Sequence, residues 1–150
     1  MLKITNLARF IIIGIIITTL SYFSYWGYQW VVYVLGVTFD VSTNYNFFDM
    51  LVGLIAMIAS IPLFLGATIV WRESKGSTQW ITIGAIGFMI KNVLEISSSV
   101  YALSLLEQVV YMDIQLAAEN IGIQLFQAAL WVFILIYFKK LSAASAVQSQ

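Results

Sequence analysis

The residues with the clearest capacity for chemistry lie in one strongly apolar stretch, GFMIKNVLEISSSVY at residues 87–101. Lys91 and Glu95 are four residues apart, so on a helix they share a face and can form an ion pair. Asn92 follows the lysine, and Ser98 belongs to a run of three serines. A charge at the centre of a bilayer costs about 3 kcal/mol, so we expect this pair to face protein or water instead of lipid.

A second set of polar residues consists of amides nearer the C-terminus. Asn120, Gln124 and Gln127 are spaced four and then three residues apart, which places them on one helical face. On antiparallel helices rising about 1.5 Å per residue, Lys91 and Gln127 lie at similar depths, roughly 18 and 17 Å from the same membrane surface. Tyr22 of an earlier apolar stretch reaches the same level. The sequence therefore predicts a buried polar layer formed by Lys91, Asn92, Glu95, Ser98, Asn120, Gln124 and Gln127.

Two interpretations of this layer remain open. In the first, the layer is a site for an ion, a proton or a small polar ligand, with Glu95 as the titratable group and Lys91 as its counter-charge. In the second, the layer is structural, and its side chains join helices through hydrogen bonds worth roughly 0.6–2 kcal/mol each. Pro62 lies in another apolar stretch near this level, where it removes a backbone hydrogen bond and predicts a helix kink.

Other kinds of site are excluded by residues that the sequence lacks. The chain contains no cysteine and no histidine, which removes thiol catalysis, disulfides and the commonest metal ligands. It has neither a phosphate-binding glycine loop nor a nucleophile elbow. Seven basic and seven acidic residues give zero net charge, with no basic run to attract nucleic acid. We therefore expect no catalytic residue, no metal, no cofactor and no nucleic-acid partner, and a chain that is not an enzyme by itself.

The elements that position these residues follow from hydropathy. The chain is 61% hydrophobic and 9% charged, with a mean hydropathy of +0.93, whereas soluble domains carry about 25% charged residues. A membrane-spanning helix needs about 20 apolar residues, and four stretches meet this length, at about 10–34, 47–71, 79–106 and 117–138. We predict an all-α integral membrane protein with a single four-transmembrane-helix domain at residues 1–140 and a disordered cytoplasmic tail at 141–150.

The distribution of basic residues predicts the orientation of this bundle. Six of the seven basic residues precede the first span, separate the second from the third, or follow the fourth; they are Lys3, Arg9, Arg72, Lys75, Lys139 and Lys140. The positive-inside rule then places both termini in the cytoplasm, in an N-in/C-in topology. We expect a multi-pass protein of the cell (plasma) membrane. Lys91 is the one basic residue that departs from the rule.

The expected function follows from these features together. Short loops, no catalytic chemistry and an aromatic-rich first span favour a non-catalytic accessory subunit of a larger membrane complex, for example a respiratory or oxygenase assembly. Its partners would be the lipid bilayer and other membrane subunits, in a hetero-oligomer or homo-oligomer. The alternative is a small ion, proton or polar-solute transporter or channel component that uses the Lys91–Glu95 layer. A membrane-embedded sensor is a third candidate.

Overall fold

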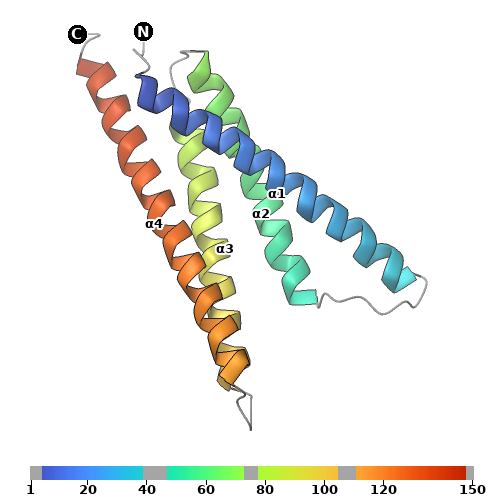
Figure 1. Ribbon diagram of the computed structural model, residues 1–150. Coiled ribbons are helices and arrows are strands. Elements are labelled where there is room, and N and C mark those ends of the chain that lie inside the picture. Colours follow the sequence, from blue (N-terminus) through green and yellow to red (C-terminus); the bar gives the residue numbers. More distant parts are fainter. Residues whose placement is uncertain (1–4, 39–46, 73–77, 105–110, 148–150) are drawn as a thin grey trace.

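The computed structural model of the protein describes residues 5–38, 47–72, 78–104 and 111–147 (Figure 1). Within these residues the chain forms four helices: α1 (Asn6–Thr38), α2 (Phe47–Trp71), α3 (Thr78–Ser104) and α4 (Tyr111–Val147). All four are long and apolar enough to cross a membrane. The predicted all-α class with four candidate spans is therefore confirmed.

The boundaries of the helices agree with the predicted spans to different degrees. The predicted span 47–71 coincides with α2, whereas α1 and α4 extend beyond the predicted spans at both ends. The prediction of a disordered tail from residue 141 is wrong for residues 141–147, which continue α4. This segment, LSAASAV, contains three alanines. Because alanine is the strongest helix former, the segment gives the preceding helix no signal to stop. Residues 148–150 lie outside the described part.

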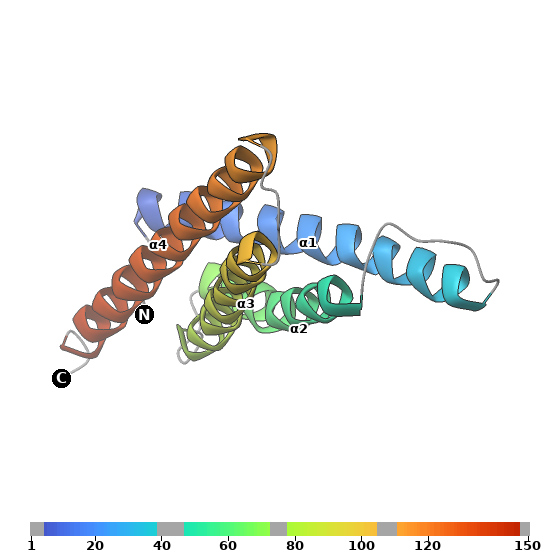
Figure 2. The same ribbon diagram turned by 90° about the horizontal axis from the view of Figure 1, so that it is seen from below.

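The helices pack in chain order, and the bundle is open on one side. Extensive contacts join α1 to α2, α2 to α3 and α3 to α4, but no comparable interface joins α4 back to α1. The N-terminal end of α1 lies beside the C-terminal part of α4, whereas the C-terminal half of α1 leads away from α3 and α4 (Figures 1 and 2). One side of the bundle, between α1 and α4, is therefore left uncovered by the described helices.

Small residues bring α2 and α3 into close contact. A Cβ atom on Gly84 would lie 2.8 Å from the carbonyl oxygen of Ala59 and would overlap the side chain of Leu63. A Cβ atom on Gly87 would lie 2.6 Å from the Cβ atom of Ala59. Close backbone approach of this kind is how membrane helices gain van der Waals contact without a hydrophobic driving force between them. This interface holds α3, which carries Lys91, in a fixed position against α2.

The centre of α2 contains Pro62, where the sequence predicts a kink. The helix continues through Pro62 from Phe47 to Trp71. Two residues earlier, the hydroxyl of Ser60 donates a hydrogen bond to the carbonyl oxygen of Ala56 at 2.8 Å. A bend at Pro62 stays a prediction, while the neighbouring Leu63 is fully buried in the bundle core.

A buried polar layer as the candidate functional site

Lys91 is the centre of the polar layer. Its Nζ atom donates hydrogen bonds to Oε2 of Glu95, one turn along α3, at 2.7 Å and to Oε1 of Gln124 in α4 at 3.3 Å. The same atom lies 5.3 Å from the ring centroid of Tyr22 in α1, within the range of a cation–π interaction. Lys91 is only 2% exposed. One buried ammonium group therefore joins three helices, and the ion pair expected from the four-residue spacing is formed.

The amides of α4 continue this network toward the end of α3. Nε2 of Gln124 donates to Oδ1 of Asn120 at 3.3 Å, and Nδ2 of Asn120 donates to Oγ of Ser99 at 2.7 Å. The Ser99 hydroxyl in turn donates to the backbone carbonyl oxygen of Glu95 at 3.0 Å. A continuous chain of hydrogen bonds thus runs from Lys91 through α4 and back to α3.

In the sequence, Ser98 and Ser99 both extend the polar face of Lys91 and Glu95 outward, and the predicted layer names Ser98. The structure places the interhelical bond on Ser99, and Ser98 instead lines a cavity beside the layer. The spacing contained a signal for this choice, because Ser99 follows Glu95 by four residues and so shares its helical face. Ser98 is rotated away from that face by about 100°.

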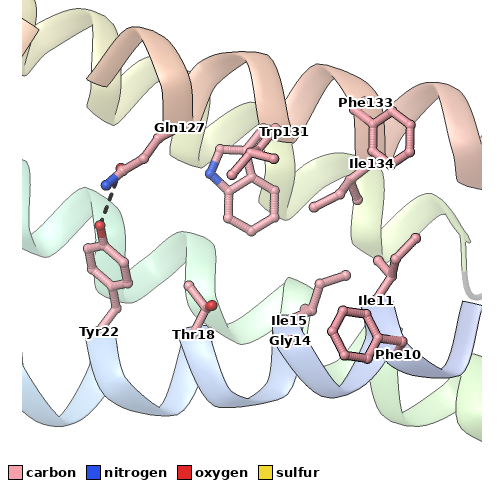
Figure 3. A pocket seen from close by; sticks show the side chains of 11 residues that line it. Phe10, Ile11, Gly14, Ile15, Thr18, Tyr22, Gln127, Trp131, Phe133 and Ile134 are labelled. Carbon is pink, nitrogen blue, oxygen red and sulfur yellow. Dashed lines mark hydrogen bonds between the residues drawn. The ribbon is translucent and has the colours of Figure 1, made fainter. Parts of the chain in front are cut away.

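Gln127 and Tyr22 form one link between α4 and α1, and a hydrogen bond of 2.8 Å between the hydroxyls of Thr5 and Tyr137 forms another at the start of α1. The Tyr22 hydroxyl donates to Oε1 of Gln127 at 3.4 Å, a long hydrogen bond (Figure 3). The Tyr22 ring also packs edge-on against Phe88 of α3, with 5.1 Å between the ring centroids. Tyr22 therefore contacts the layer at both Lys91 and Gln127, and it positions α1 against α3 and α4.

Asn92 does not join the network. Its side chain is fully buried, and neither Nδ2 nor Oδ1 has a hydrogen-bond partner among the described residues. Asn92 directly follows Lys91, so its side chain leaves α3 about 100° away from the lysine. A buried polar group without a partner costs about 1–3 kcal/mol. Asn92 is therefore a source of instability within the layer instead of one of its supports.

Two cavities adjoin the layer and share a wall formed by Trp26, Glu95 and Gln124. The first, which we call the Lys91 cavity, has a volume of about 380 Å³ and is lined by Ser21, Tyr22, Tyr25, Trp26, Lys91, Glu95 and Gln124. The second, which we call the Asp49 cavity, has a volume of about 280 Å³ and is lined by Trp26, Phe48, Asp49, Val52, Glu95, Ser98, Ser99, Asn120 and Gln124. The Lys91–Glu95 pair therefore borders open space as well as protein.

An apolar groove occupies the uncovered side of the bundle, between α1 and α4 (Figure 3). Its volume is about 450 Å³, and the Tyr22–Gln127 hydrogen bond crosses it. Its lining residues are Phe10, Ile11, Gly14, Ile15, Thr18, Tyr22, Gln127, Leu130, Trp131, Phe133 and Ile134. We call this feature the α1–α4 groove. It exposes an apolar surface beside the polar layer.

The layer combines a buried ion pair with neighbouring amides and open space. In the described ranges, no three residues of the metal-ligating types His, Cys, Asp and Glu group closely enough to hold a metal ion. The layer contains one ion pair and the amide side chains of Asn120, Gln124 and Gln127, and two cavities adjoin it. A comparison of the chain with models of protein families, with curated proteins and with solved structures finds no match.

Proposed function

We propose that the chain is a non-catalytic subunit of a larger membrane protein complex, and that a helix of a partner subunit packs into the α1–α4 groove. The supporting observation is the uncovered side of the bundle, where α4 makes only sparse contact with α1. Phe10 and Phe133, on opposite walls of the groove, are 76% and 54% exposed. The partner is a different chain or a second copy of this one, since a membrane subunit can assemble in either way.

The residues of α1 in the groove favour a helix as its occupant. Gly14 and Thr18 are spaced as a small-xxx-small motif, the pattern that lets membrane helices approach closely. Elsewhere in the bundle, the small residues Gly84 and Gly87 of α3 allow close approach and are covered by α2. Gly14 is not covered, because a Cβ atom placed on it would meet nothing within 4 Å. A partner helix could approach α1 closely at Gly14, as α2 approaches α3 at Gly84 and Gly87.

The proposed location is the plasma membrane, with both termini in the cytoplasm. In support, the N-terminal end of α1, the C-terminal ends of α2 and α4, and the N-terminal end of α3 all lie at one end of the bundle (Figure 1). The basic residues of the described part, apart from Lys91, belong to these helix ends; they are Arg9, Arg72, Lys139 and Lys140. A cytoplasmic position of this end follows the positive-inside rule.

A cross-linking experiment tests the groove as the site of assembly. Because the chain has no cysteine, single substitutions Gly14→Cys and Gly122→Cys can each carry a benzophenone photoprobe. Gly122 is the matched control, since its Cβ would also meet nothing within 4 Å and it does not line the groove. We expect Gly14→Cys, in native membranes, to give one cross-linked band of defined mass that contains a second protein chain. Gly122→Cys should not give this band.

A blocking substitution makes the test independent of the probe. Gly14→Trp fills the groove and should lower the ratio of co-purified partner to this chain, whereas Gly122→Trp should leave that ratio unchanged. If Gly14→Cys cross-links only to lipid and Gly14→Trp purifies with an unchanged set of chains, then lipid covers the groove and the proposed assembly is wrong.

The second candidate function is a component of an ion, proton or polar-solute transporter. It is favoured by the two cavities that border the Lys91–Glu95 pair. The double variant Lys91→Met/Glu95→Gln removes both charges without leaving either one unpaired. If this variant assembles normally but loses a solute flux in proteoliposomes, the layer serves transport. If the flux persists, this candidate is rejected, and if the variant instead fails to assemble, the pair is structural.

A further inference from the structure

One end of the bundle carries a concentration of positive charge. This end holds the start of α1 and the C-terminal ends of α2 and α4 (Figure 1), and its basic residues in the described part are Arg9, Arg72, Lys139 and Lys140. The acidic residues of the described part lie elsewhere; they are Asp49, Glu95, Asp113 and Glu119. In the full sequence, segments 1–9, 72–78 and 139–150 contain six basic residues and one acidic residue, Glu73. This end therefore has a net positive charge.

The basic side chains of this end are accessible to a partner outside the chain. All four are exposed, whereas Lys91 is buried in the polar layer. None of the four forms an ion pair with an acidic residue of the described part. Exposed cations that no acid neutralises create a positive potential, and such a potential attracts anions. The end of the bundle is thus complementary in charge to an anionic partner.

A contact between α1 and α4 brings three of these cations to one part of the surface. The hydroxyls of Thr5 and Tyr137 form a hydrogen bond of 2.8 Å. Arg9 follows Thr5 by four residues, so the two share a face of α1. Lys140 follows Tyr137 by three residues and shares a face of α4 with it. Arg9 and Lys140 therefore each lie about one helical turn from the same hydrogen bond, and Lys139 adjoins Lys140. We call Arg9, Lys139 and Lys140 the basic cluster.

The basic cluster lies at the level where a membrane presents its lipid headgroups. All four helices are long and apolar enough to cross a bilayer. Trp71 and Trp80, at the same end of the bundle, are 47% and 45% exposed, and exposed tryptophans are typical of the boundary between hydrocarbon and headgroups. Long basic side chains extend from this boundary toward the polar region. The anions closest to the cluster are therefore the phosphates of lipids.

We propose that the basic cluster binds the headgroup of an anionic phospholipid. Charge complementarity favours an anionic lipid over a zwitterionic one, because a zwitterionic headgroup carries an ammonium group that three cations repel. Each lysine or arginine near an anionic lipid surface strengthens binding by about fivefold. The proposal is independent of the partner helix in the α1–α4 groove, since the headgroup binds at the surface of the bundle and not within the groove.

Native mass spectrometry of the full chain in a mild detergent tests this proposal. The chain is mixed with phosphatidylglycerol and phosphatidylcholine of different acyl mass, so that each bound lipid is identified by its mass. We expect the first bound lipid to be phosphatidylglycerol, with an affinity at least tenfold higher than that of phosphatidylcholine. The double variant Lys139→Gln/Lys140→Gln should lower the affinity for phosphatidylglycerol at least tenfold, because two of three cations are lost. Its affinity for phosphatidylcholine should not fall.

Two further double variants control for charge and position. Lys139→Arg/Lys140→Arg keeps both cations and should bind phosphatidylglycerol as the wild type does. Gln115→Glu/Ala118→Glu lowers the net charge by the same amount as the glutamine variant, but at exposed positions near the start of α4, and it should also bind as the wild type does. Circular dichroism establishes that each variant is folded.

Three results would overturn the proposal. The first is equal affinity of the wild type for the two lipids, and the second is an unchanged affinity of Lys139→Gln/Lys140→Gln for phosphatidylglycerol. The third is an equal loss of affinity in Gln115→Glu/Ala118→Glu, which would attribute the preference to net charge instead of to the basic cluster. Displacement of phosphatidylglycerol by inorganic phosphate, beyond that caused by sodium chloride of equal ionic strength, would show a site for free phosphate and would likewise reject the lipid.

Discussion

Replacement of Lys91 by methionine tests whether the polar layer holds the bundle together. Methionine keeps an unbranched apolar side chain but removes the ammonium group and its hydrogen bonds to Glu95 and Gln124. Removal of one partner from a buried ion pair costs about 3–5 kcal/mol, because the other charge is left buried without compensation. The side chain of Glu95 is 21% exposed, so the carboxylate left behind retains access to water. We therefore expect Lys91→Met to lower the free energy of unfolding by about 3 kcal/mol.

Replacement of Glu95 by glutamine should lower the free energy of unfolding more than Lys91→Met does. Glu95→Gln leaves the Lys91 ammonium without its carboxylate, and the Lys91 side chain is only 3% exposed. We expect a loss near the upper end of the same range, about 4–5 kcal/mol. The double variant Lys91→Met/Glu95→Gln should be less destabilised than either single variant, because replacement of a whole buried pair by neutral residues is often close to neutral.

The assay is reversible unfolding in mixed micelles by increasing mole fractions of sodium dodecyl sulfate, followed by tryptophan fluorescence and circular dichroism. The wild type and the three variants are compared under one set of conditions. The reasoning is refuted if both single variants unfold within about 1 kcal/mol of the wild type, or if the double variant shows the sum of the single effects, since coupled neighbours should not be additive.

Three further substitutions probe the surroundings of the layer. Asn92→Leu should raise the free energy of unfolding by about 1 kcal/mol, because it removes two buried polar atoms without partners; the control Asn120→Leu, which breaks hydrogen bonds at 2.7 and 3.3 Å, should lower it. Gly84→Ala should destabilise by about 1–3 kcal/mol, because its Cβ meets the α2 backbone, whereas Gly122→Ala should not destabilise. Pro62→Ala restores a backbone donor and should leave stability unchanged or raise it, as measured in the same assay. Stabilisation by Asn120→Leu would contradict its hydrogen-bonding role. A Gly84→Ala variant as stable as the wild type would contradict the close contact with α2, and strong destabilisation by Pro62→Ala would contradict the expected effect of the proline.

The existence of four helices could be predicted because the physics behind it is simple. Apolar stretches of spanning length have to satisfy their backbone groups internally, so they form helices. The Lys91–Glu95 pair could be predicted for a similar reason, since its geometry depends only on spacing within one helix. Helix rise also places Lys91 and Gln124, on antiparallel helices, at similar depths. The hydrogen bond of 3.3 Å between their side chains is consistent with these depths.

The partners of the other polar residues could not be predicted, because they depend on how each helix is rotated and how the helices cross. Spacing grouped Asn92 with Lys91, but only the packing of α3 shows that Asn92 has no partner within the described part. Hydropathy could not predict the uncovered side of the bundle either. An apolar residue such as Phe10 has the same sequence signature whether it faces lipid or protein, since lipid tails are as apolar as leucine.

The mass of the native particle is the most direct test of the proposed role as a subunit. The chain has a mass of 16.9 kDa, and it would be purified from its own membrane in a mild detergent and measured by native mass spectrometry. We expect a heavier particle that contains further membrane chains in a fixed ratio, and that loses them when Gly14 is replaced by tryptophan. A stable, monodisperse particle of 16.9 kDa that retains its fold would contradict the proposed role.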